Sequence, residues 1–241
     1  MSVGKGAAVP ARFAFLHVGD DVTLPAILVK SIRRFHPAAT IAQCTDKSSP
    51  AVAGVDEVSR LEGDSGKLMT FRLASFAALQ AGAPTLFLDT DMIVLAKLDF
   101  SAMLDRHDVA VCRRQFDLNV EMSPRLRNLE FSEHAGRTLG EVYPYLACTT
   151  LTRDNAFWLA CLAELERLDA KLHVWYGDQQ AIREVVNSGR FRVRLLPESV
   201  YACLPNRPQK SSAPRILHFK GPALKQAMID AASGNPYKGE R

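Results

Sequence analysis

Short apolar runs alternate with amphipathic stretches along the first half of the chain. Residues 13–18 and 85–88 are nearly continuous apolar runs, of the kind that form strands buried on both faces of a sheet. Apolar residues recur at helical spacing in residues 23–36 and 66–80, which predicts a helix in each of these stretches. This alternation predicts an α/β fold in which helices flank a mostly parallel central sheet.

The remaining pattern extends the same fold as one domain. Further strands are expected at residues 40–44, 55–58, 109–112, 145–152, 191–196 and 215–219, and further helices at residues 154–168 and 178–186. Residues 113–144 are polar and lack periodicity, and such long irregular segments are often functional. We predict a disordered lead-in at residues 1–11, one domain over residues 12–225 and a C-terminal tail at residues 226–241.

Composition and charge narrow the classes of function. Of the 241 residues, 23% are charged, and the net charge of +4 is too mild for a dedicated nucleic-acid-binding protein. No apolar run approaches the roughly 20 residues of a membrane span. The first twelve residues lack the apolar core of a secretory signal. The five cysteines are widely spaced and form no CxxC pair, and four of them lie in apolar surroundings that suit small core residues, which fits a reducing cytoplasm.

The stretch from residue 199 to residue 229 is basic. It contains no acidic residue, and its basic residues are Arg207, Lys210, Arg215, Lys220 and Lys225. This imbalance suits a diphosphate. A solvated basic face, or a patch that touches anionic lipid, is the alternative. We therefore predict a cytoplasmic protein and leave peripheral contact with the inner face of the membrane open, together with the oligomeric state.

Two carboxylates follow one of the buried runs directly. Asp89 and Asp91 flank Thr90 after residues 85–88, and the chain is apolar again from Met92. Ligands of open α/β sheets bind beyond the carboxyl ends of the strands. Two carboxylates this close repel each other unless a cation compensates, and Mg²⁺ or Mn²⁺ prefers carboxylate oxygens. A strand that ends in an ordinary turn is the alternative, because Asp is common in turns.

The segment from Leu86 to Val94 resembles the DxD segment of family 8-type glycosyltransferases, which have the GT-A fold. The resemblance implies a single GT-A-type, Rossmann-like domain. It also implies that Asp89, Thr90 and Asp91 contact a nucleoside-diphosphate sugar, UDP-linked in that family, through Mn²⁺ or Mg²⁺. His218, in a segment that is similar to the family's His-x-x-Gly element, is implied as the third metal ligand.

Further matches to the family imply contacts with the donor. Arg72, Asp178 and Gln179 are implied to orient the donor sugar, although Asp178 could equally be a helix N-cap. The other residues implied in donor binding are His17, Val18 and Gly19 at the nucleobase, Lys67 at the start of the Arg72 helix, and Gly221 with Lys220 or Lys225 at the phosphates. Where the family has an Asn-x-Gly element, this chain has Leu146-Ala147-Cys148 and two threonines.

These matches predict a metal-dependent, retaining transfer of a sugar to an acceptor hydroxyl on a glycan, a glycolipid or a small molecule. Residues 113–144 are the candidate acceptor side or lid. Two alternatives stay open. A sugar nucleotidyltransferase would usually carry a Gly-rich basic loop after the first strand, and residues 13–21 lack one. A non-catalytic sugar-nucleotide-binding protein would have no need to retain Asp89, Asp91, Asp178 and His218 together.

Overall fold

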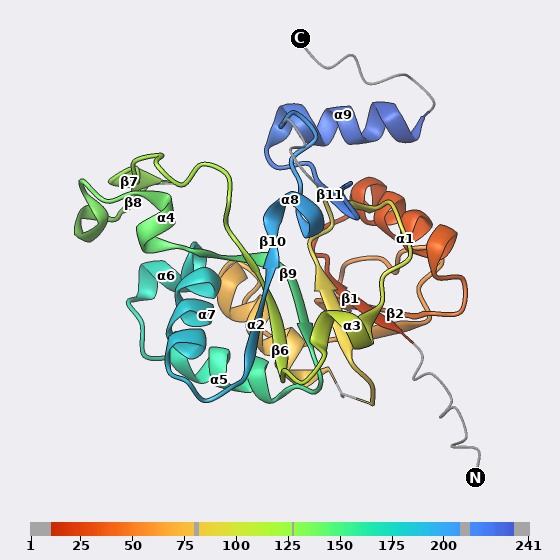
Figure 1. The fold of residues 1–241 in the computed structure, drawn as a ribbon, viewed down its shortest axis with the longest axis horizontal. Coiled ribbons are helices and arrows are strands. Elements are labelled where there is room, and N and C mark those ends of the chain that lie inside the picture. Colours follow the sequence, from red (N-terminus) through yellow and green to blue (C-terminus); the bar gives the residue numbers. More distant parts are fainter. Residues whose placement is uncertain (1–10, 80–81, 127, 208–212, 234–241) are drawn as a thin grey trace.

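A seven-stranded sheet runs through the centre of the protein (Figure 1). The computed structural model describes residues 11–79, 82–126, 128–207 and 213–233. In chain order, the strands of this sheet are β1 (Arg12–Leu16), β2 (Thr40–Thr45), β3 (Glu57–Arg60), β4 (Thr85–Leu88), β6 (Val109–Arg113), β9 (Tyr145–Thr152) and β10 (Val193–Pro197). Their order across the sheet is β10-β6-β9-β4-β1-β2-β3.

The sheet is parallel except for β9. β1 pairs in parallel with β2 and with β4, β2 with β3, and β10 with β6. β9 lies between β4 and β6 and runs antiparallel to both. The prediction of an α/β fold with a mostly parallel sheet is therefore confirmed.

Helices cover both faces of the sheet. They are α1 (Thr23–Phe35), α2 (Leu68–Ala78), α3 (Phe100–Leu104), α4 (Leu139–Val142), α5 (Ala156–Leu165), α6 (Ala170–Val174), α7 (Gly177–Asn187), α8 (Glu198–Tyr201) and α9 (Pro222–Ala232), with a 3-10 turn, η1 (Ser132–His134). One core cluster joins α1 and α3 to one face of the sheet, through residues such as Phe13, Ile32 and Phe100. A second cluster joins α2, α5 and α7 to the other face around Phe76 and Trp158.

Two small sheets lie beside the main one. β5 (Met92–Val94) pairs antiparallel with β11 (Ile216–His218), so the segment that follows the acid pair is held by a strand from the end of the chain. β7 (Arg125–Leu126) and β8 (Leu129–Glu130) form a hairpin within the segment that was expected to be irregular. Figure 1 shows this hairpin and α4 projecting at one end of the molecule, near α6 and α7.

The observed boundaries differ from the predicted ones chiefly at the ends of the chain. Residues 222–232 form α9, which packs against α1 and buries Ala227 and Met228, so part of the expected tail belongs to the folded domain. The rest of that tail after Ser233, and the expected lead-in apart from residue 11, lie outside the described residues. None of the described helices combines the length and the apolar character that crossing a membrane requires.

Candidate functional site

The acid pair, Asp89 and Asp91, lies where the order of the strands reverses. β2 and β3 lie on one side of β1 and β4 lies on the other, so the crevice at the carboxyl ends of β1 and β4 is the expected ligand site of an open α/β sheet. Asp89 follows β4 directly, and its side chain is 29% exposed. Asp91 precedes β5 and is buried. One carboxylate therefore faces solvent while the other is enclosed.

Arg72 joins Asp89 to Asp178. Its guanidinium, on α2, lies 2.5 Å from Oδ1 of Asp89 and 3.1 Å from Oδ2 of Asp178, and it also donates to the carbonyl oxygen of Ala147 at 3.0 Å. Only 12% of the arginine side chain and 6% of the Asp178 side chain are exposed. The planar, multiply donating guanidinium can hold both carboxylates at once, which an ammonium group could not do as well. The structure thus brings together three residues that the sequence had assigned to donor binding.

Burial opposes the negative charge of Asp178. It raises the pKa of that carboxyl above its ordinary value, although the charge of Arg72 acts in the opposite direction.

The backbone just before Asp178 is strained. Tyr176 has a φ of 66°, which is rare for a side chain of this size. At Gly177 an added Cβ would lie 2.1 Å from the carbonyl oxygen of Leu172. Such local backbone strain is found at functional sites, where the surroundings hold it in place.

Asp91 has two basic partners from the end of the chain. Nε2 of His218 lies 3.4 Å from Oδ1 of Asp91, and Nζ of Lys225 lies 3.1 Å from Oδ2. The register of β11 on β5 sets this contact, because His218 pairs with Met92 and the amide of Phe219 donates to the carbonyl oxygen of Asp91. Lys225 is in the first turn of α9. Of the two lysines proposed for phosphate, it is therefore Lys225 that contacts the acid pair.

The opposite charges of Asp91 and of its partners His218 and Lys225 stabilise one another. Burial would raise the pKa of Asp91, but hydrogen bonds from His218 and Lys225 and their positive charge lower it to about 2. Burial would lower the pKa of His218, but Cys148 and Asp91 beside it raise that pKa well above its ordinary value. An imidazole that binds a metal must lose its proton, so metal binding here would be coupled to proton release.

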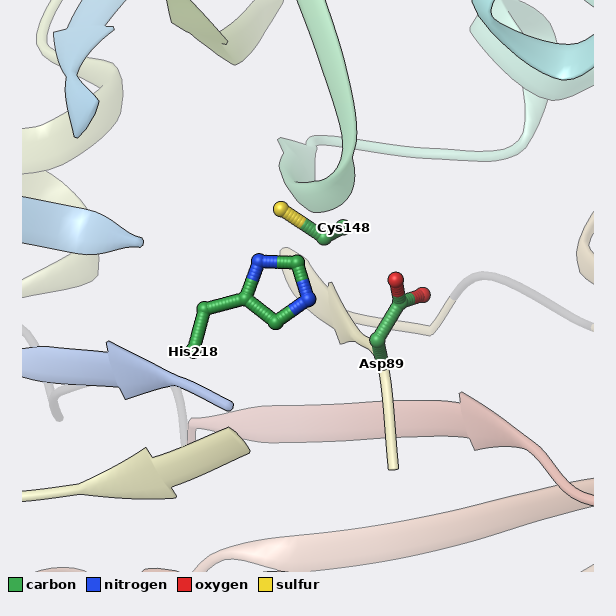
Figure 2. Close-up of side chains that lie close together, drawn as sticks. All are labelled: Asp89, Cys148 and His218. Carbon is green, nitrogen blue, oxygen red and sulfur yellow. The ribbon is translucent and has the colours of Figure 1, made fainter. Parts of the chain in front are cut away.

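A third potential metal ligand, Cys148, lies beside Asp89 and His218. One ligand atom from each of these three side chains lies within 4.8 Å of the others (Figure 2). The sequence had placed Asp91 in this set and had assigned the cysteines to the core. The local pattern gave no signal for Cys148, because its position follows from the antiparallel pairing of β9 with β4. In that pairing, the amide of Asp89 donates to the carbonyl oxygen of Cys148 at 3.2 Å.

The predicted nucleobase residues lie at the end of β1. His17 is buried, and its Nε2 has no hydrogen-bond partner among the described residues. Val18 is half-buried, and Gly19, with a φ of 117°, donates its amide hydrogen to the hydroxyl of Ser49. Thr90 is half-buried next to the acid pair.

The other predicted residues have simpler surroundings. Lys67 is exposed at the N-terminus of α2, and Lys220 is exposed, with Glu198 as a charged neighbour. Gly221 forms the N-terminal boundary of α9 with a φ of 90°. The remaining basic residues of the stretch 199–229 are partly engaged elsewhere: Arg207 with Asp117 and Arg215 with the carbonyl oxygen of Lys97, while Lys210 lies outside the described residues.

Two buried residues that the sequence analysis missed anchor the segment 113–144. Arg114 donates to Oε1 of Gln179 at 3.0 Å and to the carbonyl oxygen of Tyr143 at 2.8 Å. The carboxylate of Glu198 accepts the amide hydrogens of residues 115 and 116, and burial raises the pKa of Glu198. Tyr143 stacks on Tyr176 with ring centroids 4.8 Å apart. The segment is therefore attached to the start of α7, where Asp178 and Gln179 lie.

Comparison with known proteins adds no assignment, because no protein-family model and no curated protein matches the chain. The chemistry of the site itself is well defined. Carboxylates, an imidazole and a thiol can coordinate a divalent cation. Lys225 and Arg72 can bind phosphate or hydroxyl oxygens, and Gln179 can donate and accept hydrogen bonds.

Proposed function

We propose that this chain is a metal-dependent glycosyltransferase that moves a sugar from a nucleoside-diphosphate donor, a UDP-sugar, to an acceptor hydroxyl. One observation carries the proposal. Each aspartate of the acid pair is bound to cationic side chains from distant segments, Asp89 to Arg72 and Asp91 to His218 and Lys225. A simple turn after β4 would not require these partners, of which Arg72 and His218 are nearly enclosed. A site for an anionic, metal-bound ligand would use them.

The side chains next to Asp89 fit a divalent cation. Carboxylate oxygens and an imidazole nitrogen are ligands that Mn²⁺ accepts, and carboxylates also suit Mg²⁺. We assign Asp89, Asp91 and His218 to the ion. When bound, the ion would supply positive charge at the departing diphosphate, which is the main electrostatic demand of glycosyl transfer. Lys225 reaches the acid pair from α9 and is assigned to the same phosphates.

The remaining side chains are assigned to the sugar and the base. Arg72 contacts both Asp89 and Asp178, and we assign Arg72 and Asp178 to hydroxyl groups of the donor sugar, together with Gln179 at the next position of α7. Residues 17–19, with the unpaired Nε2 of His17, are assigned to the nucleobase. The family resemblance implies transfer with retention of the anomeric configuration.

The segment 113–144 is assigned to the acceptor, a glycan, a glycolipid or a small molecule. Its support is the attachment through Arg114 and Tyr143 to the start of α7, which places the segment beside the proposed sugar site. The five cysteines are free and buried, which supports a reducing, cytoplasmic location. The basic residues near α9 support contact with anionic lipid at the inner face of the membrane as an accessory property.

The test is incubation of the full chain with a panel of UDP-sugars, with and without Mn²⁺, and measurement of UDP release and of sugar transfer across an acceptor panel. Activity should require the metal and should fall by at least about a hundredfold in Asp89→Ala, which loses a metal ligand. The control is Glu166→Ala, because Glu166 is an exposed carboxylate at the end of α5 and is not among the residues assigned to the metal or the donor. Turnover that is independent of metal, or full activity in Asp89→Ala, would overturn the proposal.

The same panel separates the alternatives. Formation of a UDP-sugar from UTP and a sugar 1-phosphate would identify a nucleotidyltransferase. Tight binding of a UDP-sugar with neither hydrolysis nor transfer would identify a binding protein.

A further inference from the structure

Cys148 occupies a position in the site that differs from those of the other cysteines. It lies in the first half of β9, is 4% exposed, and is paired across the sheet with the residue that follows β4. Cys44 and Cys161 are enclosed by the apolar cluster on the other face of the sheet. Cys148 is the only cysteine among the described residues that belongs to a group of three potential metal ligands. Its environment is therefore that of a ligand as well as of a core residue.

The distances in this group are close to those of a metal site. The ligand atoms of Asp89, Cys148 and His218 lie within 4.8 Å of one another, and Figure 2 shows the three side chains close together, Asp89 from just after β4, Cys148 from β9 and His218 from β11. A tetrahedral ion with bonds of about 2.0 Å to nitrogen or oxygen and about 2.3 Å to sulfur places its ligands roughly 3.3–3.5 Å apart. Small side-chain rotations would close the remaining gap.

We propose that the thiolate of Cys148 is a ligand of the metal ion that Asp89 and His218 bind. The thiol loses its proton to solvent, and a metal–sulfur bond forms. This inference rests on the metal centre of the proposed function and assigns it a metal preference. A carboxylate, imidazole and thiolate set favours Zn²⁺ and Co²⁺, and it disfavours Mg²⁺, which binds oxygen ligands.

Cobalt reports a sulfur ligand directly. Titration of the full chain with Co²⁺, without any sugar nucleotide, should produce the near-ultraviolet thiolate-to-cobalt charge-transfer band. Millimolar Mg²⁺ should leave that band unchanged. In Cys148→Ser the band should disappear, and Co²⁺ affinity should fall about tenfold or more, as it does when metal sites lose a supporting group. The matched control is Cys161→Ser, a buried cysteine on α5, which should keep the band.

A second measurement needs no variant and so does not depend on whether Cys148→Ser folds. X-ray absorption of the zinc-loaded wild-type chain should contain one sulfur at about 2.3 Å. Co²⁺ binding without the charge-transfer band, a band that persists in Cys148→Ser, or a zinc shell of nitrogen and oxygen alone would overturn the inference.

The outcome for Cys148 is separable from that for glycosyl transfer. Metal-dependent sugar transfer combined with purely nitrogen and oxygen ligation would leave the proposed function standing and remove Cys148 from the site. A Cys148-dependent cobalt band in a chain that neither binds nor transfers any UDP-sugar would support Cys148 as a metal ligand and would overturn the proposed function.

Discussion

Arg72 should be the residue on which the stability of the site depends most. Its guanidinium is the shared partner of Asp89, Asp178 and the carbonyl oxygen of Ala147, and the side chain is 12% exposed. Arg72→Met keeps an unbranched apolar side chain and removes the charge and the donors. Asp178 would then be a buried carboxyl group without its cation, and removing one partner of a buried pair costs about 3–5 kcal/mol.

The pH dependence of Asp178 ionisation sets an independent upper limit on this loss of stability. Without Arg72, Asp178 can avoid an unpaired charge by staying protonated. From its ordinary pKa of 3.8, this costs about 4.4 kcal/mol at pH 7 and about 1.6 kcal/mol at pH 5, at about 1.36 kcal/mol per pH unit. A carboxyl group whose folded pKa is raised stabilises the fold below its unfolded pKa, and that contribution is lost as the pH rises through the folded pKa. Arg72→Met should therefore lose about 4 kcal/mol at pH 7 and no more than about 1.6 kcal/mol at pH 5.

Urea unfolding followed by the fluorescence of the two tryptophans, Trp158 and Trp175, measures both values. The melting temperature at pH 7 should fall by about 8–16 °C, since 1 kcal/mol corresponds to roughly 2–4 °C in a chain of this size. Asp178→Asn, added to Arg72→Met, should restore about 2 kcal/mol at pH 7, because a neutral amide removes the cost of keeping the buried carboxyl group protonated. The control Arg167→Met, at a 76% exposed side chain, should change stability by less than about 0.5 kcal/mol. A loss for Arg72→Met below about 1 kcal/mol, or an equal loss at pH 5 and pH 7, would refute this reasoning.

Three further predictions concern other parts of the molecule. Hydrogen bonds from Arg192 lower the pKa of Asp108 to about 2, so Asp108→Asn should cost about 0.5–1 kcal/mol in urea at pH 7. That cost should vanish as the pH falls from about 4 to 2, and a constant cost would contradict it. Gly177→Ala should lose at least about 2 kcal/mol in the same assay, because its Cβ would meet the carbonyl oxygen of Leu172 at 2.1 Å; wild-type stability would show that this backbone yields easily. Lys225→Met should weaken UDP binding by calorimetry about tenfold, the worth of one charged hydrogen bond, with little loss of stability because the side chain is 43% exposed, and unchanged affinity would remove it from the phosphate site.

The central part of the site could be predicted from the sequence. Asp89 ends a continuous apolar run, and such a run in an α/β chain is a buried parallel strand whose carboxyl end faces the ligand crevice. Arg72, on the helix before that strand, and Asp178, in the first turn of another helix, were expected at the site through the family resemblance. The hydrogen bonds of Arg72 to both aspartates could be identified only in the structure, because no local sequence pattern indicates which carboxylate an arginine contacts.

The placement of the chain's last segments needed the structure for a different reason. His218 reaches Asp91 through β11 and β5, which form a two-stranded sheet of three residues each. Strands this short carry no periodicity from which a register could be deduced. The choice between Lys220 and Lys225 depends in turn on where α9 begins, and the sequence analysis had treated most of that helix as a tail.

The direction of β9 accounts for the least predictable feature of the site. In a parallel sheet, the residues that end each strand form the ligand edge, and the residues that begin it lie at the opposite edge. β9 runs against its neighbours, so its first residues lie at the ligand edge instead. The carbonyl oxygen of Ala147 can therefore accept from Arg72, and Cys148 lies across from Asp89. One reversed strand thus places a thiol among carboxylates and an imidazole, and this is why a cysteine that reads as a core residue becomes a candidate ligand.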